Sequence, residues 1–211
     1  MKSPGKIIET QADVDEGADW LAARDPALAK AYTIAGQLPL RRKPEGFAEL
    51  VHAIVAQPVS VASAAAMSAK VAEAGLLTPE AVLATPDADM RAIGLTRQKV
   101  RYIRALAKAG IDYDALRTLP DREAIKVLTS VTGIGVWTAE IYLMFSLGRA
   151  DVLAAGDLAI QEAVRLVYGL EARPSERELR VMAEAWRPWR AVAGRLFWAY
   201  YMAQRNWEGP W

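Results

Sequence analysis

The sequence predicts an all-α protein, built as a two-lobed helical bundle. Apolar residues recur at spacings of three and four along most of the chain, and no stretch sustains the period-2 alternation of a strand. Proline, glycine and small polar residues interrupt this pattern where helices would end. With 53% apolar residues among 211, the chain can bury a sizeable core, and we expect about ten helices.

Helix boundaries follow from these interruptions. Asp25-Pro26 opens a short helix, residues 39–44 form a basic loop, and Pro58 ends the apolar helix that begins at Phe47. Ser60 caps an alanine-rich helix for which we expect close packing against a neighbour. The expected helices are a short one from Pro26, 47–56, 61–74, short ones from Pro79 and Pro86, 97–109, 120–131, 137–147, 157–168, 175–186 and 189–204.

These helices are expected to form a single domain, residues 1–211, with two lobes. One lobe covers approximately residues 50–150 and contains a helix-hairpin-helix, and residues 1–49 with 151–211 form the other. Seven tryptophans and seven tyrosines crowd toward the C-terminal half, where most should pack between helices.

The hairpin is the turn Gly133-Ile134-Gly135 between two predicted helices. Backbone N–H groups at Gly133, Gly135 and Thr138 would point outward at a helix N-terminus, where the helix dipole favours a phosphate. An ordinary helix–helix turn is the alternative, and for a lone G-x-G it is the better interpretation. The surrounding motifs decide between the two.

Composition excludes several kinds of chemistry. The chain has no cysteine and one histidine, which argues against disulfides, zinc sites and iron–sulfur clusters. The net charge is only +1, so DNA binding would depend on local basic patches, and the densest runs from Arg97 to Lys108. Residues 1–15 lack the apolar core of a signal peptide and no later segment is a membrane-spanning run, so we expect a cytoplasmic protein.

Several weak motifs occur together in the order found in the HhH-GPD superfamily of DNA glycosylases, which the chain resembles from roughly residue 45 to residue 205. The matching blocks are residues 47–66, Gly94-Leu-Thr-Arg-Gln-Lys99, the hairpin segment 128–140, Ala155-Gly156-Asp157, and Trp186-Arg-Pro-Trp189 with Trp198. The resemblance implies a helical glycosylase fold. The N-terminal β lobe of some members is expected to be lacking, because too few residues precede Phe47.

Within the superfamily the chain most resembles the DNA-3-methyladenine glycosylase II branch. Bifunctional branches carry a Schiff-base lysine two residues after the second hairpin glycine, where this chain has Trp137, so no lyase activity is expected. The resemblance assigns Trp137 and Trp198 to a pocket that stacks on a cationic alkylated purine. Core packing is the alternative for both. Ile141 and Leu158 replace tyrosines of the best-known member, which leaves the substrate range open.

The resemblance makes Asp157 the catalytic carboxylate. Such a group stabilises the positive charge that develops on the sugar as the base leaves, and it can also orient or deprotonate water. Asp157 is equally well placed to cap the helix that follows it. Both roles can coexist.

Other positions follow from the same resemblance. Gln57 and Pro58 match the segment that fills the gap left by a flipped base, although Pro58 can also simply end a helix. Backbone carbonyls of Thr129, Val131 and Ile134 match a structural Na or K site, and no other cofactor is expected. His52 is expected to be a satisfied, partly buried residue, and Glu140 is expected to cap or pair near the hairpin helix.

Three functions remain open on these grounds. The first is a monomeric, monofunctional glycosylase that flips alkylated purines out of double-stranded DNA during base excision repair. The second is a helix-hairpin-helix protein that binds DNA without catalysis, for which Asp157 would be needed only as a cap. The third is a glycosylase for other damaged or mismatched bases, with the same mechanism and a different pocket.

Overall fold

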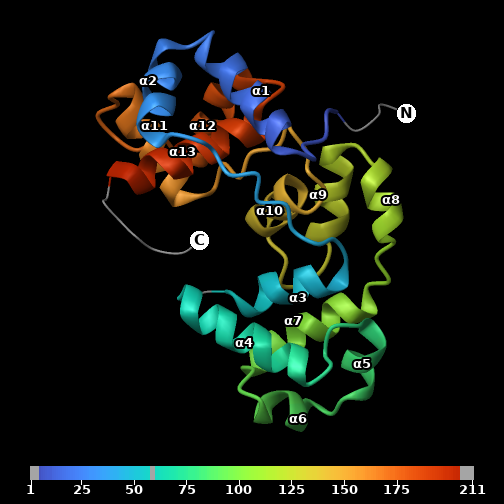
Figure 1. The fold of residues 1–211 in the computed structure, drawn as a ribbon. Helices are drawn as coiled ribbons and strands as arrows, with labels where there is room; N and C mark the ends of the chain where they lie inside the picture. Colours follow the sequence, from blue (N-terminus) through green and yellow to red (C-terminus); the bar gives the residue numbers. More distant parts are fainter. Residues whose placement is uncertain (1–4, 58–59, 205–211) are drawn as a thin grey trace. The chain divides into compact units, whose positions relative to one another are not determined.

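The computed structural model describes residues 5–57 and 60–204 and confirms the all-α prediction (Figure 1). Within these residues there is no β-strand, only an isolated bridge between Ile7 and Arg149. The helices are α1 Gln11–Ala22, α2 Pro26–Ala35, α3 Phe47–Val55, α4 Val61–Glu73, α5 Pro79–Ala84, α6 Asp87–Ala92, α7 Arg97–Lys108, α8 Tyr113–Thr118, α9 Asp121–Thr129, α10 Val136–Phe145, α11 Leu158–Tyr168, α12 Glu176–Met182, a 3₁₀ helix Ala183–Trp186, and α13 Arg190–Gln204.

The described chain contains more helices than the ten or so expected from the sequence. Helix α1 lies in a segment for which no helix was predicted, although Thr10 and Asp13 form a capping box at its start. Helix α8 was also missed; Asp112 caps it through the backbone N–H of Ala115. Both caps were readable. Behind the first, the buried residues Val14, Ala18 and Leu21 recur at helical spacing, so α1 could have been predicted. Helix α8 has only 6 residues, too few for an apolar period to support its cap.

The chain divides into two compact units. The first comprises the described residues up to 42 together with those from 140 onward, and the second comprises those from 43 to 139. The boundary falls inside α10, so the hairpin and the start of this helix belong to the second unit and its remainder to the first. No helix within residues 5–57 and 60–204 is long and apolar enough to cross a membrane.

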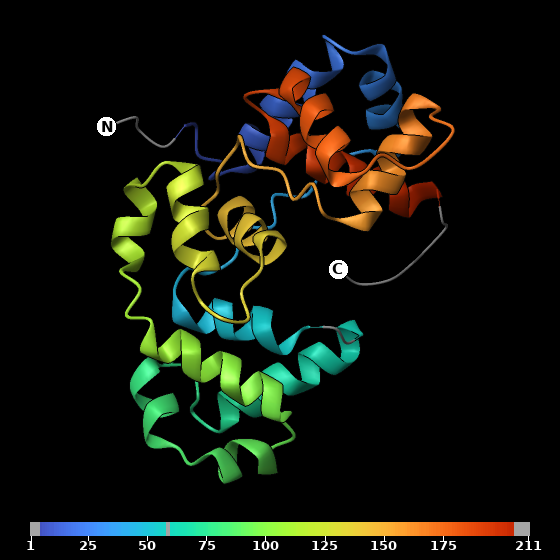
Figure 2. The same ribbon diagram turned by 180° about the vertical axis from the view of Figure 1, so that it is seen from behind.

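The first unit is organised around α13, which packs against α11, α2 and α1 (Figures 1 and 2). Its core includes Leu28, Val164 and Phe197, none of which exposes any surface. Trp186 and Trp189 are buried, as their crowding in the sequence predicted. Burial of this apolar surface is the main driving force for the unit.

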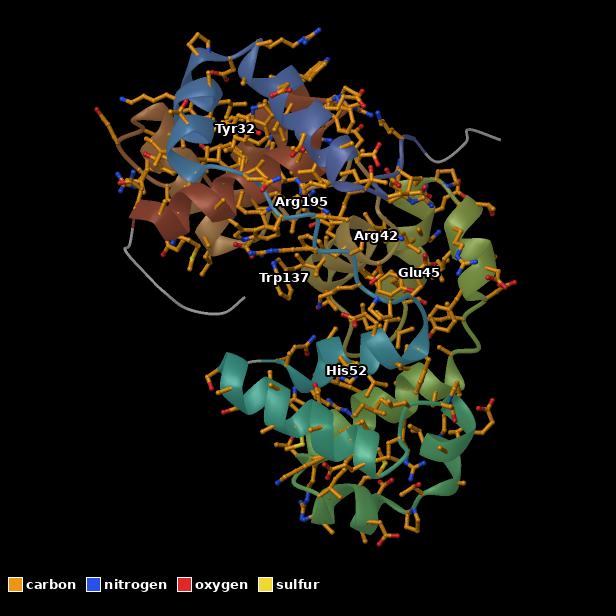
Figure 3. All side chains as sticks on the ribbon, in the orientation of Figure 1. Tyr32, Arg42, Glu45, His52, Trp137 and Arg195 are labelled. Carbon is orange, nitrogen blue, oxygen red and sulfur yellow. The ribbon has the colours of Figure 1, made fainter. Side chains whose placement is uncertain are left out.

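A buried arginine links α13 to the loop that follows α2. Arg195, labelled in Figure 3, donates to the carbonyl oxygens of Leu40 at 3.1 Å and Ala191 at 2.9 Å, and its guanidinium lies 4.7 Å from the Phe145 ring. Burial, and then the charges of Arg41 and Arg42, lower the pKa of Arg195 to about 9. Carbonyl oxygens and an aromatic face therefore hold this cation in the core.

The second unit packs α7 against α3 and α5. Ile54, Val82 and Ile103 are fully buried at these contacts. Two residues of the basic helix α7 have structural partners. Lys99 donates to the Val55 carbonyl at the end of α3 at 2.6 Å, and Arg104 donates to the Val82 carbonyl at 2.8 Å. The basic stretch is therefore partly a set of helix-end contacts, and only part of it remains for a ligand.

The expectation of close packing for the alanine-rich helix was wrong. Helix α4 has Val71 as a fully buried residue near its end, whereas Ala62, Ala65 and Ala66 are exposed. Alanine favours a helix through its backbone propensity whether or not a neighbour covers it, so its abundance predicted the helix but not the packing.

Candidate functional site

Asp157 lies in the first unit at the N-terminal cap of α11, with extended backbone (φ −73, ψ 120). Its Oδ1 atom accepts the backbone N–H groups of Ala159 at 2.9 Å and Ile160 at 3.1 Å. The carboxylate is therefore fixed at a helix N-terminus, where the helix dipole favours a negative charge.

The segment before Asp157 is held in place by buried contacts. Ala154 and Ala155 expose no surface, and the Ala154 carbonyl accepts the Asp157 N–H at 3.0 Å. From inside α11, the Gln161 side chain donates to the Ala155 carbonyl at 2.9 Å. Backbone on both sides of Asp157 is thus anchored, which limits the directions that its carboxylate can take.

Trp198 is in direct contact with Asp157. Its indole Nε1 donates to Oδ1 of Asp157 at 3.2 Å, and the residue is only 6% exposed. The Phe145 ring lies 5.7 Å from the Trp198 ring, centroid to centroid. The structure therefore brings together the predicted catalytic residue and one predicted pocket residue, and it reveals a polar contact that the sequence did not indicate.

A buried carboxylate occupies the same unit one turn into α10. Glu140 is 3% exposed and pairs with Arg180 of α12 at 2.8 Å, which agrees with the expected pairing of this residue. Burial raises the pKa of Glu140, and the hydrogen bond from Arg180 opposes that rise. Arg180 also binds Glu176 at 2.7 Å, so α10 and α12 are joined through a single guanidinium.

We expect Arg180→Met to destabilise the protein by about 2 kcal/mol near pH 7.5, and by less as the pH falls. A carboxyl whose pKa is raised by folding adds most to the free energy of unfolding below its unfolded pKa, which is about 4.3. That stabilisation is lost as the pH rises through the pKa of the carboxyl in the folded protein. Removing Arg180 raises the folded pKa of Glu140 further, so the loss grows toward neutral pH. Urea unfolding of the variant and of Arg177→Met, an exposed neighbour on α12, tests this. Equal losses at about pH 5 and pH 7.5 would contradict it.

In the second unit, the two glycines of the hairpin have different surroundings. Gly133 has a φ of +101, and a Cβ placed there would overlap Cγ of Tyr102 on α7. Gly135 is exposed, and a Cβ there would meet nothing within 4 Å. Gly133 is therefore required by the close approach of Tyr102, whereas the backbone at Gly135 is open to a ligand.

We expect Gly133→Ala to lower the free energy of unfolding by about 3 kcal/mol, from the sum of an unfavourable φ and overpacking against Tyr102. Gly135→Ala is the matched control and should change stability by less than about 0.5 kcal/mol. Urea or thermal unfolding of both variants measures the difference. Similar stabilities of the two variants would show that Tyr102 can move aside at little cost.

Gln57 connects the end of α3 to the hairpin. Its Nε2 donates to the Gly133 carbonyl and to Oγ1 of Thr138, each at 3.3 Å. The Thr138 side chain is buried at 5% exposure, so what Thr138 can offer a ligand is its backbone N–H in the first turn of α10. Gln57, Gly133 and Thr138, selected separately from the sequence, thus form one hydrogen-bonded cluster.

Trp137 projects from the start of α10 and is 45% exposed (Figure 3). The preceding Val136 is 46% exposed. Large exposed apolar side chains beside open backbone N–H groups are typical of a binding surface, so the exposure of Trp137 favours binding over core packing. Trp198, by contrast, is buried.

The predicted cation ligands surround the end of α9. Thr129 is the last residue of this helix, whose C-terminal carbonyls carry partial negative charge. The Val131 carbonyl already accepts the Ile134 N–H at 3.0 Å, which leaves it one lone pair. Carbonyl oxygens in a tight turn suit a monovalent cation, so the donor chemistry fits such an ion. Among the described residues there is no cluster of three side chains able to hold a metal.

The remaining sequence predictions had mixed outcomes. Pro58 lies outside the described residues, so its role as a wedge stays a prediction. His52 is partly buried as expected, but it was wrong to expect it satisfied, because Nδ1 is buried without a hydrogen-bond partner within residues 5–57 and 60–204. Sequence reasoning missed Tyr102 and Arg180; an aromatic within the polar stretch of α7 was the only signal for Tyr102.

Comparisons with known proteins agree on one family. The family model described as "HhH-GPD superfamily base excision DNA repair protein" matches residues 51–191. DNA-3-methyladenine glycosylase 1 of Schizosaccharomyces pombe is 30% identical over 165 residues, which cover 74% of this chain and 72% of that protein. DNA-3-methyladenine glycosylase 2 of Escherichia coli is 28% identical over 163 residues, which cover 71% of this chain and 55% of that protein.

Solved structures give the same result. A crystal structure of DNA-3-methyladenine glycosidase from Bacillus halodurans superposes with a TM-score of 0.82 at 30% identity, and the match covers 98% of this chain and 95% of that one. The S. pombe 3-methyladenine DNA glycosylase in complex with abasic DNA has a TM-score of 0.75 at 28% identity, covering 87% and 95%. Sequence and fold therefore lead to one conclusion: the chain belongs to the HhH-GPD superfamily of base excision DNA repair proteins.

Proposed function

We propose that this protein is a monofunctional DNA glycosylase that hydrolyses the N-glycosidic bond of alkylated purines, and that it acts as a cytoplasmic monomer on double-stranded DNA. The observation that carries the proposal is the Asp157 carboxylate, held at the start of α11 by two backbone N–H groups and the Trp198 indole in a chain of this superfamily. The relatives named 3-methyladenine glycosylases support the alkylated class of substrate.

DNA binding is assigned to the hairpin. Gly135 leaves its backbone open, and the first turn of α10 has N–H groups that no helical carbonyl accepts. A phosphate accepts such donors and also interacts favourably with the helix dipole. Because net charge is only +1, this local site accounts for more of the duplex affinity than the overall field of the protein does.

Base release is assigned to Asp157. Alkylation at a ring nitrogen makes the purine cationic, and when the bond to C1′ breaks, its electron pair leaves with the base, which becomes neutral. Positive charge then develops on the sugar, and the Asp157 carboxylate stabilises it until water adds at C1′ and loses a proton. A cationic base needs little help from a general acid, so one carboxylate suffices.

Trp137 supplies the other assigned roles. Its exposed indole can stack on an electron-poor purine that has been flipped out of the duplex. An indole cannot form a Schiff base with the abasic sugar, so the reaction ends at hydrolysis and leaves the strand intact. We also propose a Na or K ion bound by the carbonyls of Thr129, Val131 and Ile134, which would offset phosphate charge at the hairpin.

The substrate class is tested by base release from duplexes that each carry one lesion: 3-methyladenine, 7-methylguanine, ethenoadenine, hypoxanthine or uracil. Release of the cationic methylpurines, with little release of uracil, is the expected result, because stacking and leaving-group ability both favour a cationic base. Preferred release of hypoxanthine or uracil would identify a glycosylase for other bases. No release from any duplex at enzyme excess would leave a DNA-binding protein without catalysis.

A further inference from the structure

The indole N–H of Trp198 points toward the Asp157 carboxylate. The indole N–H lies 3.2 Å from Oδ1, the same oxygen that accepts the two backbone N–H groups of α11. Three donors therefore converge on one carboxylate oxygen. Two of them come from the helix that Asp157 caps, and the third comes from α13, an element far along the chain.

The third donor adds a constraint that the cap alone does not provide. The two cap N–H groups come from adjacent residues at the start of α11 and hold Oδ1 from that side alone. The indole N–H approaches the same oxygen from a separate helix, α13, and therefore constrains the orientation of the carboxylate from a second direction. A reacting carboxylate must be held within about 0.5 Å and 10–20° of its productive geometry.

The indole is itself held rigidly. Trp198 is 6% exposed, and its ring is tilted 30° against the Phe145 ring at a centroid distance of 5.7 Å. Phe145 is in turn covered by the guanidinium of Arg195, 4.7 Å from its ring, and Arg195 is fixed by the Leu40 and Ala191 carbonyls. Reorienting Trp198 would disturb its contact with Phe145 and the contact of Phe145 with Arg195. The indole N–H is therefore preorganised before substrate binds.

Burial also separates the two tryptophans by role. Trp137 is 45% exposed and offers its ring to a ligand, whereas Trp198 is almost entirely covered by protein. A tryptophan so deeply buried is usually expected to place its N–H on a partner, and here that partner is the reacting carboxylate.

We propose that Trp198 is a positioning residue, whose indole N–H fixes the orientation of the Asp157 carboxylate and acts on base release through that residue. This inference rests on the proposed function, and it assigns Trp198 a role different from stacking on the flipped base. It predicts that an aromatic ring without the N–H cannot replace Trp198.

The test is a double-mutant cycle on single-turnover base release from methylated DNA. Trp198→Phe keeps an aromatic ring and removes the donor, and it should slow release roughly ten- to hundredfold, the rate equivalent of one hydrogen bond to a charged group. In an Asp157→Asn background the same substitution should change the residual rate by less than about threefold. Trp186→Phe, which removes an indole N–H from the Tyr168 hydroxyl in the same unit, is the matched control and should stay near the parent rate.

Each other outcome overturns the proposal. An undiminished rate in Trp198→Phe, or an equal loss with aspartate and asparagine at position 157, would mean that the ring acts on the base and not on Asp157. A parent protein that releases no base would overturn the proposed function, and this inference with it, whereas failure of the cycle alone leaves the proposed function standing.

A second measurement does not depend on substituting Trp198. Labelling tryptophan with ¹⁵N gives one indole N–H resonance per ring, and one of them should lie downfield because of its carboxylate partner. In Asp157→Ala that resonance should move upfield and exchange faster with deuterium, while the others stay in place. An indole spectrum unchanged by Asp157→Ala would contradict the contact.

Discussion

Asp157→Asn is expected to slow single-turnover excision on the order of a hundredfold or more, the cost of removing roughly 3 kcal/mol of transition-state stabilisation. Asparagine keeps the Oδ1 acceptor that caps α11 and binds the Trp198 N–H, so the fold and the local geometry should persist. What it removes is the negative charge. The measurement is release of methylpurines from duplex DNA with enzyme in excess.

Two controls separate catalysis from capping. Circular dichroism and thermal unfolding should show a variant close to the parent in stability, and its affinity for abasic-site DNA should be retained. An excision rate within a few-fold of the parent would leave Asp157 as a helix cap without a catalytic role. A variant that fails to fold would instead show that the charge itself is needed at the start of α11.

Gly135→Val is expected to weaken binding to abasic-site DNA roughly ten- to a hundredfold at constant salt, because a branched side chain would cover the N–H groups offered to the phosphate. The effect should fall on undamaged DNA as well, since a phosphate contact carries no information about the base. Fluorescence anisotropy titrations on both duplexes measure it.

The structure makes this variant a clean test of binding. A Cβ at Gly135 has nothing within 4 Å and its φ is not in the left-handed region, so the substitution should not affect folding. Ala92→Val, at an exposed position on α6 of the same unit, controls for adding an apolar side chain. Parental affinity in a folded Gly135→Val would remove the hairpin from the DNA-binding surface.

Local signals in the sequence predicted most helices. Each predicted helix boundary was marked by a capping residue, a proline or a glycine next to a periodic apolar run. The cap at Asp157 and the end of α3 before Pro58 are examples. Packing was predicted less well. The alanines of α4 predicted a closely packed neighbouring helix, but several of them are exposed in the structure. Alanine has a high helix propensity whether it is buried or not, so its abundance does not indicate packing.

The candidate site divides in the same way. Asp157, Gly135 and Trp137 were identified from the order of the motifs along the chain. The place of a single residue within such an order can be read from the sequence alone. Contacts between distant segments were not readable: Tyr102 against Gly133, Arg180 against Glu140, and the Trp198 N–H on Asp157. These depend on how helices far apart in sequence approach one another, and no spacing along the chain encodes that approach.

Base release without strand cleavage can be tested by analysing the products from a duplex that carries a single 7-methylguanine and is incubated with stoichiometric protein. We expect free 7-methylguanine in solution, a strand that stays whole until alkali cleaves it at the abasic site, and no protein–DNA adduct after borohydride reduction. Absence of the free base would contradict glycosylase activity. A strand cut without alkali, or a borohydride-trapped complex, would contradict the assignment of Trp137 at the position of the Schiff-base lysine.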